Sequence, residues 1–269
     1  MLNHQIDWFL LDQVREKNPI VLNVANLVTI DKVADAVSAI GASPIISFES
    51  NEAKNMVELA DTITINLGTI NQEQVNQIES VLQLNNSNKP VVLDPVAISA
   101  VPYRLKFVQS LFNDFHFDVI RGNASEIAAL VGADNTSHGI DAGLVNHPFQ
   151  VAKLCAQRSN SIVVLTGETD IITDGQFIYE NFLSSTMLKM NIGSGDILSS
   201  IIAAFLGITS NTRDACVVAT ILVTVAGIIA SQKSLGLGSW QVQFFDQLSQ
   251  LNAEKLLDFL NEREEYFHD

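Results

Sequence analysis

The stretch Val119-Ile120-Arg121-Gly122-Asn123-Ala124-Ser125-Glu126-Ile127 joins an apolar β-strand to a helix. Its first two residues are β-branched and are typical of a strand, whereas the segment 124–131 has the apolar spacing of an amphipathic helix. Asn123, followed three residues later by Glu126, fits a capping pair at the start of that helix. A strand that runs directly into a helix is the repeating unit of α/β proteins.

The same alternation extends along most of the chain. We predict strands at Ile20–Val24, Pro44–Phe48, Thr62–Asn66, Pro90–Asp94, Val119–Ile120 and Ile162–Thr166. Between them we predict helices at Ile30–Ile40, Ala53–Ala60, Gln72–Leu84, Arg104–Phe112, Ala124–Val131 and Phe149–Gln157. Because the strands are continuous apolar runs, both faces of the sheet should be covered. The pattern predicts an α/β fold of three αβα layers around a mostly parallel central sheet.

The last part of the chain changes character. A hairpin is expected with Asp174-Gly175 as its turn, between Ile171-Ile172 and Phe177-Ile178. Helices are then predicted at Asp196–Leu206 and Arg213–Ser231, with two more after Trp240. No internal repeat and no long linker interrupts the sequence, so we expect one domain over residues 1–269.

Composition limits the classes of partner. Hydrophobic residues make up 47% of the 269 residues and charged residues 17%, which predicts a large core. The net charge of −15 disfavours nucleic acid and anionic membranes as partners. The N-terminus lacks the pattern of a secretory signal. The uncharged segment Ala215–Ser231 is somewhat shorter than the ~20 residues of a membrane span, so we interpret it as a buried helix. A soluble, cytoplasmic protein is therefore expected.

The turn Gly193-Ser194-Gly195-Asp196 precedes the apolar helical run that starts at Ile197. Glycines let the backbone approach a ligand closely, and the free N–H groups of the next helix favour negative charge. Such a turn can stabilise a transferring phosphoryl group, and Asp196 is placed to accept a proton from a substrate hydroxyl. The motif taken alone also fits an ordinary glycine loop with an acidic helix start.

Other polar residues follow the predicted strands, where ligands bind in open α/β sheets. The forked cation of Arg121 suits phosphate oxygens, and the Thr166 hydroxyl is placed to donate to them. Asp94 and Glu126 are carboxylates that suit Mg²⁺ held through water. Each of these residues also has a plain structural reading, as a helix cap or a strand end.

Several motifs, in order, resemble the hydroxyethylthiazole kinases, which are ribokinase-like enzymes of thiamine salvage. The run Arg121-Gly-Asn-Ala-Ser-Glu126-Ile127 is very similar to a motif of that family. Further resemblances lie at Gly41-Ala-Ser-Pro44, Asn66-Leu-Gly68-Thr69, Val92-Leu-Asp94-Pro95-Val96, Thr166-Gly-Glu168 and Gly236-Leu-Gly238-Ser239-Trp-Gln241. The resemblance covers nearly the whole chain.

The resemblance implies a ribokinase-like fold, ATP as phosphate donor, Mg²⁺, and phosphorylation of the hydroxyethyl group of 4-methyl-5-(2-hydroxyethyl)thiazole. It also implies a homotrimer with the thiazole sites between subunits. Carried over by motif, the catalytic base would be Asp196, with Gly193, Ser194 and Gly195 as the anion hole. The ATP-binding residues would be Arg121, Asn123, Thr166 and Gly167, and the metal would be bound by Asp94 and Glu126. The thiazole would lie near Asn26, Ile46, Gly68 and Gly193.

The chain departs from the family pattern near the expected acceptor site. Asp196 stands where family members commonly have Cys, Ile46 replaces the usual Met, and Ala97–Ala100 replaces a glycine-rich turn. These changes leave other acceptors open, such as another small heterocyclic alcohol. An ATP-dependent NAD(P)H-hydrate dehydratase on the same fold, and a non-catalytic binding protein, are the remaining alternatives.

Overall fold

The computed structural model describes residues 6–133 and 147–263. Its strands form one eight-stranded sheet in the order β2-β1-β3-β4-β5-β6-β7-β8. The strands are β1 (Ile20–Val24), β2 (Ser43–Ile46), β3 (Thr62–Asn66), β4 (Val91–Asp94), β5 (Val119–Asn123), β6 (Ile162–Thr166), β7 (Asp170–Thr173) and β8 (Ile178–Asn181). The strands from β1 to β6 pair in parallel, as the alternation predicts.

The sheet ends in an antiparallel hairpin of β7 and β8. The predicted turn residues Asp174 and Gly175 lie in its loop, but Phe177 is a loop residue and not part of the second strand. The Asp174 side chain explains the difference, since its Oδ1 accepts hydrogen bonds from the N–H groups of Gln176 at 2.9 Å and Phe177 at 2.7 Å. These bonds keep the backbone in a wider turn before pairing starts at Ile178.

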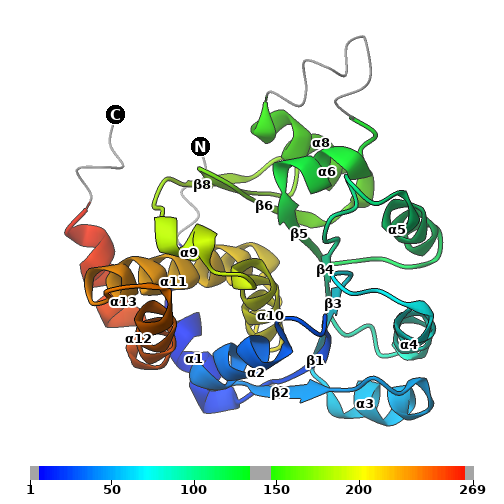
Figure 1. Cartoon of the computed structure of the whole chain (residues 1–269), viewed down its shortest axis with the longest axis horizontal. Helices are drawn as coiled ribbons and strands as arrows, with labels where there is room; N and C mark the ends of the chain where they lie inside the picture. The colour runs from blue at the N-terminus through cyan, green and yellow to red at the C-terminus, as the bar shows by residue number, and fades with distance from the viewer. Residues whose placement is uncertain (1–5, 134–146, 264–269) are drawn as a thin grey trace.

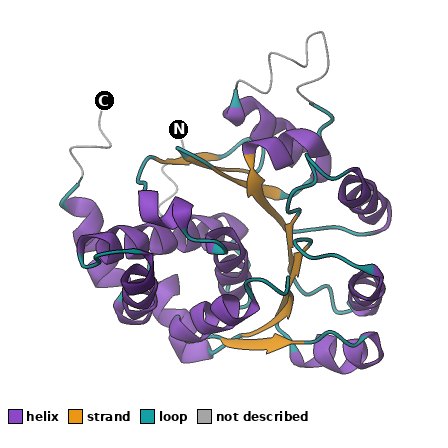
Figure 2. Cartoon of the chain, in the orientation of Figure 1, coloured by secondary structure: helices purple, strands orange, loops and turns teal. Residues whose placement is uncertain are grey.

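Helices cover both faces of the sheet (Figure 1). One layer contains α3 (Ala53–Leu59), which follows the short 3₁₀ helix η1 (Ser50–Glu52), α4 (Gln72–Leu84), α5 (Pro102–Asp114), α6 (Ala124–Leu130) and α8 (Pro148–Ser159). The other contains α1 (Leu10–Lys17), α2 (Ile30–Ala39), α9 (Thr186–Met190), α10 (Ser194–Leu206), α11 (Thr212–Gln232), α12 (Leu237–Gln250) and α13 (Ala253–Asn261). Figure 2 shows the sheet edge-on between these layers, which confirms the αβα prediction.

Two apolar cores result, one on each face of the sheet. Alternate residues of one strand supply both: Val163 and Leu165 of β6 belong to the core under α8, whereas Val164 belongs to the core under α10 and α11. Strands buried on both faces must be apolar throughout, which explains the continuous hydrophobic runs of the sequence.

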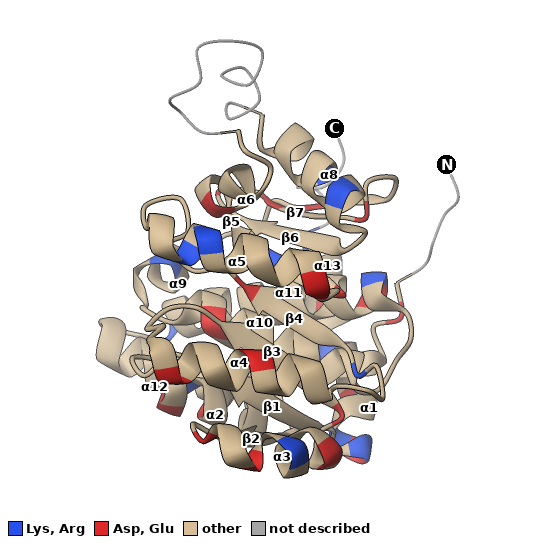
Figure 3. Cartoon of the chain, turned by 90° about the vertical axis from the view of Figure 1, so that its right-hand side faces the viewer, with Lys and Arg blue, Asp and Glu red and all other residues tan. Residues whose placement is uncertain are grey.

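Helix α11 is the central element of the larger helical layer. Within the described residues it is the one helix long and apolar enough to cross a membrane, yet 83% of its apolar window is buried inside the fold. The prediction of a core helix is therefore confirmed. The chain carries 30 acidic and 15 basic residues. Figure 3 shows charged positions scattered over the outer helices of one face.

The prediction missed α1 and α9 and made the second strand too long at its end. No side chain caps the start of α1, where Phe9 is the N-cap residue, so its start lacks the usual sequence signal. Helix α9 has only 5 residues, which is too short for a periodic pattern. β2 ends at Ile46, and the Ser47 hydroxyl donates to Glu52 at 2.6 Å, within the next turn.

Candidate active site

The carboxyl ends of the parallel strands meet at one edge of the sheet, where the predicted polar residues gather. Asn26 follows β1, and Asn66 and Asp94 end the paired strands β3 and β4. Arg121 lies in β5, and Thr166, the last residue of β6, pairs with Asn123. Helix α10 packs against this part of the sheet from one side. It thereby brings the glycine turn at its N-terminus to the same edge.

The turn before α10 has a geometry suited to an anion. Gly193 is the N-cap residue with φ of 98°, a left-handed conformation that favours glycine. The Ser194 hydroxyl lies 2.7 Å from the carbonyl oxygen of Leu188 and 2.8 Å from that of Asn191, so it holds the turn in place. The first backbone N–H groups of a helix have no partner within it and can face a ligand. The turn can therefore bind negative charge through its backbone.

Lys32 of α2 also fixes this turn. Its ammonium group donates to the side-chain oxygen of Asn191 at 3.1 Å and to the carbonyl oxygen of Ile192 at 2.9 Å. The sequence analysis did not identify this residue, because the contact joins segments about 160 residues apart.

Arg121 links the turn to the strand ends. Its Nη2 donates to the Thr166 hydroxyl at 2.7 Å, and its Nη1 lies 3.3 Å from Oδ2 of Asp94. A β-carbon placed on Gly195 would come within 1.9 Å of Nη1, so the guanidinium lies against the backbone of the turn. Two of the predicted phosphate ligands and the glycine turn are thus in direct proximity.

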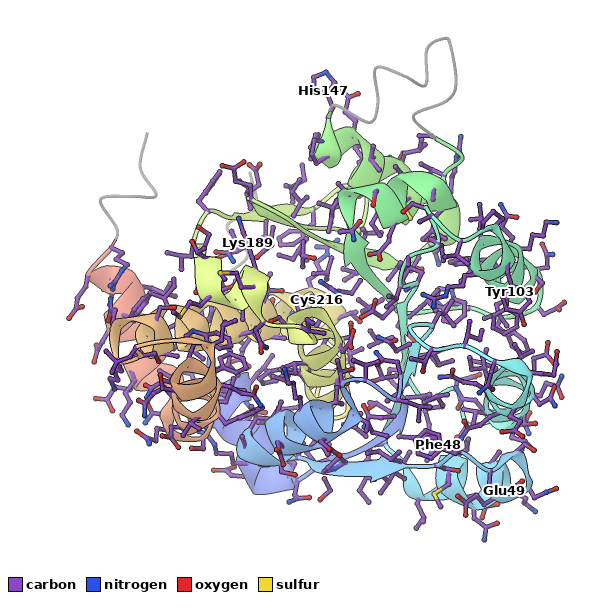
Figure 4. The ribbon with its side chains drawn as sticks, in the orientation of Figure 1. Phe48, Glu49, Tyr103, His147, Lys189 and Cys216 are labelled. Atoms are coloured by element: carbon purple, nitrogen blue, oxygen red, sulfur yellow. The ribbon has the colours of Figure 1, made fainter. Side chains whose placement is uncertain are left out.

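A cleft of about 410 Å³ opens beside these groups. Its lining includes the predicted residues Arg121, Thr166, Gly167, Gly193, Ser194 and Gly195. It also includes Asp170 and Lys189, to which the sequence motifs assigned no role. Lys189 lies on α9, as Figure 4 shows. No recognisable sequence motif surrounds Lys189. It lines the cleft because α9 packs on α11.

The two predicted metal ligands behave differently. Asp94 is fully buried, and its Oδ1 has no hydrogen-bond partner among the described residues. Burial raises the pKa of Asp94 to about 7; Asp196 and Glu126 add to this rise, while Arg121 and Ser199 oppose it. The described residues contain no group of three or more potential metal-ligating His, Cys, Asp or Glu side chains.

Glu126 completes the capping box that its spacing predicts. Its Oε2 accepts from the N–H of Asn123 and its Oε1 from the N–H of Ala97, both at 2.8 Å. The Asn123 oxygen in turn accepts from the N–H of Glu126 at 3.0 Å. Asn123 caps α6 and is not among the residues that line the cleft.

Asp196 lies in the first turn of α10, directly after Gly195, which lines the cleft. Its carboxylate accepts hydrogen bonds from Nδ2 of Asn26 at 2.7 Å and from Nδ2 of Asn66 at 2.9 Å. The hydroxyl of Thr29, another residue that the sequence analysis missed, also donates to it. Gly68 contacts Asn26, since a β-carbon there would lie 2.8 Å from Nδ2.

Ile46 lies at the end of the edge strand β2, opposite Asn23 of β1. It is therefore placed one strand beyond Asn26. Phe48, two residues after Ile46, lines a separate cleft of about 220 Å³ together with Leu27 and the start of α4. Figure 4 labels Phe48 at that end of the molecule, away from Lys189. Of the predicted thiazole residues, Asn26 contacts Asp196 directly, Gly68 lies against Asn26, and Gly193 lines the cleft with the predicted ATP-binding residues.

Comparisons with known proteins agree on one family. The model of the hydroxyethylthiazole kinase family matches residues 11–254. A hydroxyethylthiazole kinase of Limosilactobacillus reuteri is 68% identical over 269 residues, which is the full length of both chains. The structure of a hydroxyethylthiazole kinase from Pyrococcus horikoshii is similar with a TM-score of 0.83 and 28% identity, covering 90% of this chain and 92% of that one.

A more distant structure shows the fold alone. A ribokinase-like superfamily protein from Enterococcus faecalis has a TM-score of 0.62 at 16% identity, covering 86% of this chain and 88% of that one. The predicted resemblance and the fold class are therefore confirmed. This chain belongs to the hydroxyethylthiazole kinase family and is a kinase with a ribokinase-like fold.

Proposed function

We propose that the chain transfers the γ-phosphate of ATP to the hydroxyl group of 4-methyl-5-(2-hydroxyethyl)thiazole, a step of thiamine salvage. The observation that carries this proposal is the position of Asp196, which directly follows Gly195 beside Arg121 and accepts a hydrogen bond from Asn26. A base between a phosphate site and an alcohol site is what in-line transfer needs. The names of the full-length relatives support the thiazole as acceptor.

Arg121, Thr166 and Gly167 are proposed to hold the triphosphate in the cleft that they line. Asn123 is proposed as a further nucleotide contact, reached beyond the cleft itself. The thiazole is proposed to lie near Asn26, Ile46, Gly68 and Gly193. Asn26 would contribute contact surface, because both of its side-chain polar atoms already bond within the protein.

Asp94 and Glu126 are the residues proposed to serve Mg²⁺. The buried Oδ1 of Asp94 lacks a partner among the described residues, and each oxygen of Glu126 accepts a single backbone N–H. Free lone pairs on carboxylate oxygens suit Mg²⁺, which binds a few carboxylates and keeps several waters. When bound, the ion would neutralise charge on the phosphate oxygens.

The steps then follow from this chain's own residues. Asp196 takes the proton of the acceptor hydroxyl while the oxygen attacks the γ-phosphorus in line. The backbone N–H groups of the turn 193–196, apart from that of Ser194, which donates to the carbonyl oxygen of Asn191 at 3.3 Å, stabilise the charge that develops, together with the guanidinium of Arg121. ADP leaves with the electron pair of the broken bond.

The homotrimer and the cytoplasmic location stay predictions. Leu27, Val28 and Phe48 expose 59%, 68% and 51% of their surface beside the acceptor residues, and these side chains are the ones that an intersubunit thiazole site would bury. Light scattering coupled to size-exclusion chromatography would measure the mass of the assembly and test this expectation.

A coupled ADP-release assay with Mg·ATP tests the acceptor. It should compare hydroxyethylthiazole with the pyrimidine alcohol of thiamine biosynthesis and with hydrated NADH. Turnover with the thiazole alone, with a phosphorylated product seen by mass spectrometry, would support the proposal. Turnover only with another alcohol would make that alcohol the acceptor in place of the thiazole. ADP release with hydrated NADH would favour the dehydratase activity. The Asp196→Asn variant, expected to keep ATP affinity and lose turnover, controls for contaminating activity.

A further inference from the structure

Donor side chains surround the carboxylate of Asp196, and the role inferred for them rests on the proposed function of that residue as the base. Within the described residues, three side chains hydrogen-bond to the Asp196 carboxylate, and all three are donors: Asn26 and Thr29 donate to Oδ2, and Asn66 donates to Oδ1. An ionised carboxylate only accepts hydrogen bonds, and bonds to a charged acceptor are the stronger kind. The surroundings therefore match a carboxylate anion held in one orientation.

The Asn26 amide cannot turn around in this network. Its Oδ1 accepts from the backbone N–H groups of Val28 at 2.9 Å and Thr29 at 3.2 Å. These backbone groups are fixed by the turn that leads into α2. Because the oxygen is engaged there, Nδ2 must point to the opposite side, where Asp196 lies at 2.7 Å.

Asn66 is oriented in the same way. Its Oδ1 accepts from the N–H of Gly68 at 2.8 Å and from Nδ2 of Asn26 at 3.1 Å. Its Nδ2 is left to donate to Oδ1 of Asp196 at 2.9 Å. Both asparagines are buried, with 5% and 3% of their surface exposed. The backbone N–H groups of two loops thus orient the amides of Asn26 and Asn66, and these amides orient the carboxylate of Asp196.

The two carboxylate oxygens are not equivalent. Each has two in-plane lone pairs, and Oδ2 uses both for Asn26 and Thr29, whereas Oδ1 uses one for Asn66. We propose that Asn26, Thr29 and Asn66 are positioning residues that present Oδ1 of Asp196 to the acceptor alcohol. Oδ1 then receives the hydroxyl proton as the new O–P bond forms and the bond between the γ-phosphorus and ADP breaks.

Thr29 offers the sharpest test, because its two side-chain groups have separate functions. Its methyl group packs against the turn, since a β-carbon on Gly193 would lie 2.7 Å from Cγ2. Its hydroxyl donates to Oδ2 of Asp196, also lies 3.1 Å from Oδ1 of Asn26, and makes no capping bond to α2, although Thr29 is the N-cap residue. Thr29→Val keeps the methyl contact and removes the hydroxyl, and Thr29→Ser does the reverse.

The experiment measures kcat and KM for five proteins: wild type, Thr29→Val, Thr29→Ser, Asp196→Ala and the double variant of Thr29→Val with Asp196→Ala. A hydrogen bond to a charged group contributes enough that Thr29→Val should lower kcat roughly 10- to 100-fold. The KM for ATP should stay within about twofold, because the nucleotide cleft is untouched. Thr29→Ser should recover most of the rate. In the Asp196→Ala background, Thr29→Val should cause no further loss.

Other results decide against the positioning role. An unchanged kcat in Thr29→Val would overturn it, as would an equal loss in both backgrounds, which indicates a general structural effect. Failure of Thr29→Ser to recover the rate would assign the effect to packing. If Asp196→Ala retains turnover, the assignment of Asp196 as the base is wrong. If Asp196→Ala loses turnover but Thr29→Val keeps the wild-type kcat, only the positioning role is wrong and the proposed function stands. Should Thr29→Val unfold early in a thermal scan, Asn66→Ala is measured in the same cycle and decides the question.

Discussion

The guanidinium of Arg121 lies directly against the backbone of Gly195, so close that a β-carbon on Gly195 would come within 1.9 Å of Nη1. Backbone and cation therefore share one small space at the start of α10. Glycine is the residue that permits this approach, since any side chain would collide with the arginine. The Gly-Ser-Gly-Asp turn is thus matched to the strand-end arginine as well as to a ligand.

Gly195→Ala should displace Arg121 from its place beside Asp94 and Thr166. Misplacing a phosphate-binding cation by about 1 Å lowers activity on the order of 100-fold, and we expect kcat/KM for ATP to fall by that order. Steady-state kinetics with varied ATP measures it. Gly238→Ala is the matched control, because a β-carbon there meets no atom within 4 Å. If both variants had the same kcat/KM for ATP, the close approach of Arg121 to Gly195 would not matter for activity.

Gly68→Ala should act on the base indirectly. A β-carbon at Gly68 would lie 2.8 Å from both Cβ and Nδ2 of Asn26, so Asn26 must shift away from Asp196. Loss of one charge-assisted hydrogen bond predicts a decrease in kcat of roughly tenfold or more. The measurement is kcat at saturating ATP and acceptor, with binding of ATP followed separately by calorimetry. A variant that lost ATP affinity at unchanged kcat would contradict this reading of Gly68.

Ala97→Gly should stabilise the protein. Ala97 has φ of 60°, a left-handed conformation that costs a non-glycine residue about 1 kcal/mol. Its N–H donates to Glu126 at 2.8 Å, which holds the backbone in that conformation. Urea unfolding should therefore give a free energy of unfolding higher by about 1 kcal/mol. Ala100→Gly, in the same loop but without positive φ, should not raise the free energy of unfolding. A lower free energy of unfolding in both variants would show that the added backbone flexibility of glycine outweighs the strain relieved at residue 97.

Asp94 should make the stability of the metal-free protein depend on pH. Burial raises its pKa from 3.8 to about 7, so between these values the folded state holds a proton that the unfolded chain has released. The contribution of Asp94 to the free energy of unfolding therefore falls as pH rises from about 4 to about 7. Asp94→Asn stays neutral throughout, so its stability relative to wild type should increase across this interval and then level off. Urea titrations with a chelator present at several pH values would measure the difference; a constant difference would contradict the raised pKa.

The sequence alone predicted most of the architecture, because each apolar run that follows a turn signal has few alternatives in an α/β protein. The six parallel strands, the hairpin and the long helices α10 and α11 all appear in the predicted order, with shifted bounds at β2 and at Phe177 of the hairpin. The prediction from sequence failed where local signals are absent, at α1 with its uncapped start and at the short helix α9. Those elements form because the larger helical layer provides apolar surface for them to pack against.

The candidate site divides in the same way. Sequence motifs identified Arg121, Thr166 and the turn before Asp196, because glycines and strand-end polar residues leave a local signature. They did not identify Thr29, whose hydroxyl reaches Asp196 across 167 positions of the chain. By itself the sequence determined which chemical groups the site contains, since residue type fixes charge and hydrogen-bonding capacity. Only the tertiary structure decided which oxygen of Asp196 keeps an unused lone pair, because that depends on the backbone N–H groups of two loops that orient the side chains of Asn26 and Asn66.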